Sequence, residues 1–261
     1  MDAEIRPFDT IAMPMPMPEP VVGRAWKIFG VYLLLQALVQ SILGAVIGAR
    51  IAVESGGVAN AEAFARALQS LAGPGACVAG AAAGLAVLRM LPRSLDERAG
   101  AGVYVSWWAP AGLREMALPA IAGMLLATAY VHVGDSFYPV DATVQQGPLA
   151  SMAQSPGSRQ WLWATFAVLC APAIEEILFR GVLLTALQRA WGTICAAAVV
   201  SLIFVALHAG EAAGYPPAMF AIGAVGILTL VLRLRTGKIA PAISAHAVYN
   251  LVIVVNALAL M

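Results

Sequence analysis

Seven long apolar stretches, separated by shorter polar segments, dominate the chain. An α-helix needs about 17–25 apolar residues to cross the hydrocarbon layer of a bilayer. The third, fifth and sixth stretches are the shortest, so we expect these helices to be tilted or to extend beyond the apolar run. The pattern predicts an all-α fold, a polytopic transmembrane helical bundle of about seven spans (six to eight), at residues 28–49, 68–91, 116–133, 160–187, 193–208, 217–232 and 239–260.

The composition excludes a soluble globular domain. Hydrophobic residues make up 61% of the chain and charged residues only 11%, against roughly 25% charged residues in soluble domains. A net charge of +1 gives no basic face for phosphates, so we expect no nucleic-acid partner. The expected surroundings are therefore the lipid bilayer.

The distribution of lysine and arginine predicts the orientation, because cytoplasmic loops carry the excess of these residues. Eleven fall on the side of the N-terminus and three on the other. The N-terminus is therefore expected in the cytoplasm, and the polar segment 134–158 outside as an irregular loop. The alanine-rich composition favours a prokaryotic source, which would place the protein in a bacterial inner membrane.

The domain organisation is simple. Residues 1–24 contain repeated Met-Pro pairs, which cannot form a helix and have little to pack against, so they are expected to be a flexible cytoplasmic tail. Residues 25–261 form one membrane domain, whose core, 160–256, carries the motifs described next.

Three ionisable residues interrupt the fourth apolar stretch: Glu175, Glu176 and Arg180. A charged side chain at bilayer depth is costly and usually marks a functional site. Glu176 and Arg180 are one helical turn apart and can neutralise each other as a structural pair. That pair leaves Glu175 without a structural explanation, so Glu175 is the first candidate for chemistry.

Two histidines lie in the later apolar stretches, each four residues from a second notable side chain. Phe204 precedes His208, and Asn250 follows His246. A carboxylate and an imidazole can activate water as a general base, and an imidazole with an amide can stabilise an oxyanion. Together with Glu175 these groups could hydrolyse an amide bond without a side-chain nucleophile.

The same groups could instead hold a metal ion. Glu175, His208 and His246 are a plausible zinc ligand set with one position open for water. Spacing along the chain does not decide between the two readings. We favour the mechanism without a cofactor and keep zinc as the alternative.

The three motifs together, Glu-Glu-x-x-x-Arg, Phe-x-x-x-His and His-x-x-x-Asn, closely resemble the CPBP family. This family includes the type II CAAX prenyl endopeptidases and bacteriocin-processing relatives, and the resemblance spans residues 161–256. It implies that Glu175 activates water together with His208, and that His246 and Asn250 form the oxyanion site. Glu176 and Arg180 would hold the helix and the first carboxylate in place, and Phe204 would pack beside the site. No motif residue departs from the family pattern, and the family has been described as both metal-dependent and glutamate-type.

The prediction is therefore an intramembrane endopeptidase that hydrolyses a peptide bond in a membrane-associated protein or peptide. The alternative is a non-enzymatic membrane scaffold or sensor that uses the polar cluster for helix packing. A transporter would also carry charges at mid-membrane, but the chain shows no repeat. His132 lies outside the motifs and is expected to be an interfacial residue.

The predicted spans raise one geometric difficulty. At 1.5 Å per residue, Glu175 would lie about 22 Å above the cytoplasmic end of its helix, and His246 only about 10 Å above the same interface. The groups meet only if helices tilt or the last helix starts inside the protein. Gly237 and Pro241 permit such a start, since irregular backbone is tolerated where it lines a cavity.

Overall fold

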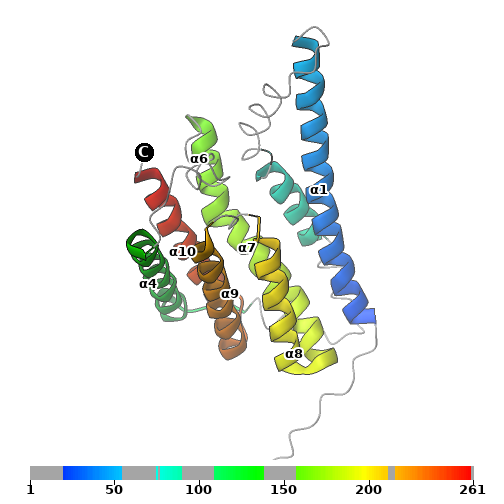
Figure 1. Ribbon diagram of the computed structural model, residues 1–261. Coiled ribbons are helices and arrows are strands. Elements are labelled where there is room, and N and C mark those ends of the chain that lie inside the picture. The colour runs from blue at the N-terminus through cyan, green and yellow to red at the C-terminus, as the bar shows by residue number, and fades with distance from the viewer. Residues whose placement is uncertain are drawn as a thin grey trace, which may run out of the picture.

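The computed structural model describes residues 20–54, 75, 77–89, 109–137, 157–210 and 215–259. Every regular element in these ranges is a helix (Figure 1). The elements are α1 (Pro20–Glu54), a short helix (Cys77–Arg89), α4 (Leu113–Phe137), α6 (Ser158–Thr165), η3 (Phe166–Cys170), α7 (Ala171–Glu176), η4 (Ile177–Leu183), α8 (Leu184–Leu207), α9 (Pro216–Thr236) and α10 (Ala240–Ala259). The predicted all-α fold class is confirmed.

The described part of the chain contains five helices that are long and apolar enough to cross a membrane, fewer than the seven expected. One half of the difference arises at Gln160–Leu207, where two predicted spans form one helical stretch of 48 residues, and the other half at the second predicted span. Gly192, with φ 77° and ψ 167°, breaks this stretch into two arms without a loop between them. Within the second predicted span, the structure describes the 13-residue helix Cys77–Arg89.

The first helix is longer than its apolar run predicts. It begins at Pro20, inside the expected tail, and ends at Glu54. Proline suits a helix start because the first-turn N–H groups have no partner within the helix. Residues 1–19, and residues 138–156 of the expected external loop, lie outside the described residues, so these two expectations stay predictions.

The centre of the bundle is η4, all of whose seven residues are buried. Its neighbours are α1, α8 and α9. Apart from Arg180, whose charge is paired inside the protein, η4 is apolar on every face and can be buried on all sides. The main core comprises Ala25, Ile28, Phe29, Val87, Ile177, Leu178, Phe179, Val182, Leu183, Leu184, Ala186, Leu187, Ala196, Val200, Phe204, Leu230 and Ile239.

Glycines allow the helices around the later site to approach closely. A Cβ at Gly123 would lie 2.1 Å from the carbonyl oxygen of Ala245, where α4 crosses α10. At Gly80 and Gly84 of the short helix, a Cβ would lie 2.5 Å from side-chain atoms of Phe166 and Ile174. Small residues at such spacing are typical of membrane helix contacts. They bring α10 and the short helix against the walls of the site.

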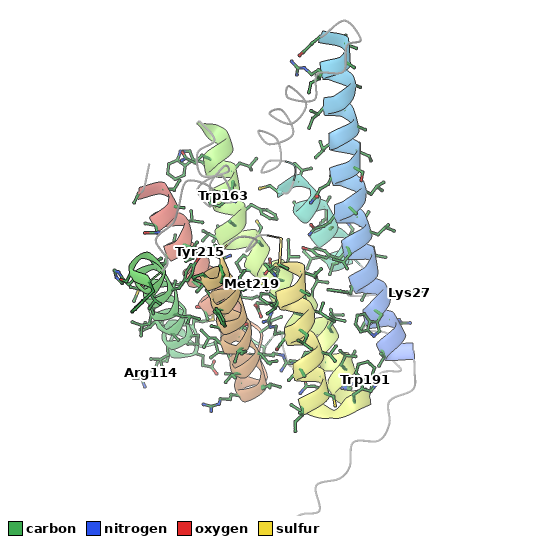
Figure 2. The ribbon with its side chains drawn as sticks, in the orientation of Figure 1. Lys27, Arg114, Trp163, Trp191, Tyr215 and Met219 are labelled. Atoms are coloured by element: carbon green, nitrogen blue, oxygen red, sulfur yellow. The ribbon has the colours of Figure 1, made fainter. Side chains whose placement is uncertain are left out.

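One end of the bundle is held by an ion pair between distant segments. Gly237 ends α9 with φ 69°, and its N–H bonds to the Arg233 carbonyl at 3.0 Å. The next residue, Lys238, contacts Glu115 of α4 at 2.8 Å. Figure 2 shows Arg114 at this same lower end of α4. Arg114 and Lys238 thus lie at one end of the bundle, as the orientation argument requires, although the side of the membrane stays a prediction.

We expect Gly123→Ala to destabilise the bundle. The added methyl collides with backbone at Ala245, and overpacking of this kind costs about 1–3 kcal/mol. Gly44→Ala is the matched control, because Gly44 has nothing within 4 Å of the position its Cβ would take. Thermal unfolding in detergent should show a lower midpoint for the first variant and an equal or slightly higher one for the second. Equal midpoints for Gly123→Ala and wild type would contradict the close α4–α10 contact.

Candidate active site

The site is built on α7, which lies between two π-helical segments, η3 and η4, about midway along the bundle (Figure 1). The N–H of Ala171 bonds to the Phe166 carbonyl, five residues back, and Leu184 bonds in the same way to Phe179. Each π turn adds a residue to the helical repeat and turns the following side chains about the axis. Such insertions are frequent at functional sites.

A proline in this segment leaves a backbone carbonyl free to accept a hydrogen bond from Asn250. In the π register, the Ala167 carbonyl would accept a hydrogen bond from residue 172, which is Pro172 and has no N–H. The Asn250 side-chain amide of α10 donates to that carbonyl at 2.8 Å. This bond fixes the amide and leaves its second N–H for another acceptor.

Glu176 contacts two other buried polar residues, His246 and Arg180. Its Oε1 accepts a hydrogen bond from His246 Nδ1 at 2.9 Å. Its Oε2 lies 3.3 Å from Arg180 Nε, an ion pair without an aligned hydrogen bond. The side chains of Glu176 and Arg180 are 0% and 1% exposed. The second motif carboxylate thus contacts His246, and through it orients an imidazole that lies 70 residues away in the chain.

Arg180 is held by two further groups. Its Nη2 donates to the Gly226 carbonyl of α9 at 2.7 Å. Its guanidinium carbon lies 4.5 Å from the centroid of the Phe204 ring, a cation–π contact. A Cβ at residue 226 would come within 3.0 Å of that ring, so glycine is needed for α9 to approach.

His208 ends the second arm of the broken helix. Its Nδ1 lies 2.7 Å from the Phe204 carbonyl oxygen. A carbonyl only accepts, so Nδ1 carries a proton, and in the neutral form of the ring Nε2 presents a lone pair. The ring stacks on Phe204 at 4.5 Å between centroids. Position and tautomer are therefore both fixed.

Glu175 lies opposite these two imidazoles. Its Oε2 is 3.8 Å from His208 Nε2 and 3.8 Å from His246 Nε2. This oxygen has no hydrogen-bond partner among the described residues. The 19% exposure of the Glu175 side chain contrasts with the fully buried Glu176. Distances above 3.5 Å between polar atoms are typical of groups that share a small molecule such as water.

A cavity of about 350 Å³ contains all four predicted catalytic residues. Its lining is mainly apolar and comes from both halves of the chain. The lining residues are Tyr32, Gln36, Cys77, Gly80, Tyr130, Trp163, Phe166, Ala167, Ala171, Glu175, Phe204, His208, Ala218, Ile222, Val225, His246, Tyr249, Asn250, Ile253 and Val254.

The zinc alternative stays a prediction. Among the described residues, no group of three or more His, Cys, Asp or Glu side chains could hold a metal ion. Glu175, His208 and His246 approach one another at 3.8 Å without forming such a group. We therefore derive no chemical step through zinc.

The structure brings together every residue of the predicted site and explains how they meet. Ile239, Pro241 and Ala242, at the start of α10, are buried, and the bond from His246 to Glu176 places His246 beside α7, which carries Glu175. His132 is exposed on α4, away from the cavity lining. The sequence reading missed the contribution of α1, although Gln36 is a polar residue inside an apolar run.

Comparison with known families gives a match over the segment that carries the motifs. Residues 157–252 match the family model described as Rce1-like, type II CAAX prenyl endopeptidase Rce1-like. This segment of the chain is similar to an Rce1-like domain. It covers over a third of the sequence and includes all seven motif residues. A search of curated proteins gave no match, and neither did a search of solved structures.

The Rce1-like match confirms the resemblance noted in the motifs. It supports CAAX-type intramembrane protease activity. Together with the five long apolar helices, it identifies an integral membrane protein that works in a lipid bilayer.

We expect Arg180→Met to unfold the site. The change leaves Glu176 buried without its cation, and breaking a buried ion pair typically costs about 3–5 kcal/mol. The double variant Glu176→Gln/Arg180→Met should recover part of the loss, because no uncompensated charge remains and the glutamine oxygen still accepts from His246. Thermal unfolding in detergent measures both.

Arg50→Met is the control for charge loss alone, since the Arg50–Glu54 pair is exposed and should add little to stability. A double variant no more stable than Arg180→Met would show that the buried charge is not the cause.

Proposed function

We propose that the protein is an intramembrane endopeptidase that hydrolyses a peptide bond in a membrane-associated protein or peptide. One observation carries the proposal: Glu175, His208, His246 and Asn250 converge on a single apolar cavity from three separate helices. The Rce1-like match supports the same reaction class.

Glu175 and His208 would activate the attacking water. Both Glu175 Oε2 and the Nε2 of neutral His208 are acceptors, and they face each other at 3.8 Å. A water held between them would donate one hydrogen to each, which turns an oxygen lone pair outward toward a substrate carbonyl. As the oxygen attacks the carbonyl carbon, its proton passes to the Glu175 carboxylate, the role of a general base.

His246 and Asn250 would stabilise the oxyanion that forms. Asn250 has one N–H left after its bond to Ala167. His246 donates its Nδ1 proton to Glu176, so it needs a second proton on Nε2 to act as a donor. With both carboxylates ionised and Arg180 charged, that proton makes the cluster neutral, which a low-dielectric site favours. Donors held in place before the reaction stabilise the developing charge most effectively.

Collapse of the tetrahedral intermediate would release the amine. The proton that Glu175 took from water passes to the leaving nitrogen, the C–N bond breaks, and the carboxylate is restored. No side-chain nucleophile and no covalent intermediate are needed. The apolar lining keeps bulk water away from the reacting groups and strengthens their electrostatic interactions.

The scaffold alternative accounts for part of the cluster only. Packing explains Glu176 and Arg180, which form an ion pair and bind His246 and Gly226. It does not explain Glu175, whose buried Oε2 has no hydrogen-bond partner within the described residues and faces two histidine nitrogens at 3.8 Å. An unpaired carboxylate oxygen weakens a fold, so its presence favours a catalytic role.

We expect Glu175→Gln to lower turnover by about 10²–10⁴-fold, the usual contribution of a general base. The panel of substrates is a set of quenched fluorescent membrane peptides, each with and without a C-terminal prenyl group, cleaved by purified protein in detergent or nanodiscs. Unfolding midpoints should stay close to wild type, since Glu175 makes no hydrogen bond with Oε2. Glu54→Gln, on the exposed end of α1, is the matched control. Full turnover by Glu175→Gln would contradict its role in water activation.

We expect cleavage to persist after chelation. The proposed mechanism uses only protons and the side chains of the site, so removal of divalent ions should leave turnover within about twofold of untreated protein, a difference well below the tenfold that 1.4 kcal/mol produces. Elemental analysis of the purified protein provides the second readout. Loss of activity on chelation, restored by zinc and accompanied by one zinc per chain, would replace this mechanism with the zinc alternative.

A further inference from the structure

An amide side chain of α1 faces the cavity but belongs to none of the motifs. Gln36 lines the cavity together with Glu175, and Tyr32, one helical turn earlier on the same face, lines it as well. On the opposite side of α1, Leu34 is 66% exposed and Leu38 is 50% exposed, as expected for side chains in contact with lipid. The cavity therefore has a polar group on a wall that is otherwise apolar.

This amide has no hydrogen-bond partner among the described residues, either side chain or backbone. Removing a neutral polar group from water without a compensating hydrogen bond costs roughly 2–7 kcal/mol. Gln36 is half-buried in the cavity wall, so its donor and acceptor groups remain accessible from the cavity. A leucine at this position would serve helix packing or lipid contact better.

The substrate of the proposed reaction needs such a group. A transmembrane segment must leave its helical conformation before a peptide bond becomes accessible, which frees N–H and C=O groups in surroundings without bulk water. Each freed group then requires a partner in the enzyme. A glutamine amide offers one donor face and one acceptor, the complement of one backbone peptide group.

We propose that Gln36 binds the unwound substrate backbone, pairing its side-chain amide with one peptide group of the segment that enters the cavity. This inference rests on the proposed function and extends it: α1, outside the Rce1-like segment, provides part of the substrate site. The substrate class it implies is an extended peptide chain, recognised through its backbone rather than through a particular side chain. The contact holds the segment while Glu175 and His208 deliver water.

The first test measures binding apart from chemistry. The dissociation constant of a fluorescent peptide from the panel is measured on Glu175→Gln and on Glu175→Gln/Gln36→Leu. We expect the added change to weaken binding by about 5–20-fold, as for loss of one or two hydrogen bonds. Gln40→Leu in the same background is the matched control, because Gln40 is the same residue type on the same helix but is exposed and does not line the cavity.

Kinetics of the single variant give a second readout that a purely structural role would not change. Gln36→Leu should raise KM by a similar factor with kcat within about twofold, the pattern of lost uniform binding. In addition, we would prepare a series of peptides in which one backbone amide at a time is replaced by an ester. One member of this series should bind wild type more weakly than the parent peptide does. That same ester should make no difference to the Gln36→Leu variant.

The outcomes separate the two proposals. Unchanged or tighter binding on Gln36→Leu, or equal weakening by Gln40→Leu, would overturn the role of Gln36 and leave the peptidase proposal standing. Peptide binding that depends on Gln36, without cleavage by wild type, would overturn the peptidase proposal alone. Failure of the Glu175→Gln protein to bind any peptide of the panel would overturn both.

Discussion

The buried charges at Glu176 and Arg180 are the constraint on which the surrounding structure depends. Neither side chain reaches solvent, and each ion costs several kcal/mol to desolvate, so both must find partners from protein. The partners come from different helices: Gly226 from α9 and His246 from α10. Satisfying the ion pair therefore fixes α7 against α10 and η4 against α9. The same contacts place His246 where Glu175 can face it, so the contacts that pack the helices also set the geometry of the site.

The sequence predicts only those parts of this arrangement that depend on residues close together in the chain. The Glu176–Arg180 pair follows from helical spacing, and the polar residues of the three motifs are visible because each interrupts an apolar run. The contact between His246 and Glu176 spans 70 residues and depends on how α10 packs against α7, which no local pattern reveals. The π turns of η3 and η4 cannot be predicted from the sequence either. Residues 161–187 are apolar nearly throughout, so the hydrophobic pattern is the same in an α and a π register.

The π register has a consequence that an α-helix could not produce. It directs the Ala167 carbonyl toward Pro172, which cannot donate, and thereby leaves an acceptor free at the cavity wall. Asn250 occupies that acceptor, which restricts its amide to one orientation. The direction of the remaining N–H of Asn250 is therefore fixed by a bond to the backbone rather than by a bond to a flexible side chain. A group held in this way needs no reorganisation when charge develops nearby, and such preorganisation is the main source of electrostatic catalysis.

Adjacent carboxylates on one helix acquire different roles from their surroundings. Glu176 faces a guanidinium and an imidazole N–H, which satisfy its charge and remove it from chemistry. Glu175, one residue earlier and turned about 100° around the axis, faces two Nε2 atoms at distances too long for hydrogen bonds. Its oxygen keeps the capacity to accept a proton.

Glu175 can act as a base because the charge of Glu176 is neutralised. Without Arg180 and His246 beside Glu176, two negative charges would share one apolar pocket, and one of the two carboxylates would have to hold a proton. A proton on Glu175 would remove the base. The ion pair beneath the cavity is thus a condition for the chemistry above it, and it explains why three ionisable residues stand together in a segment that lipid would otherwise surround.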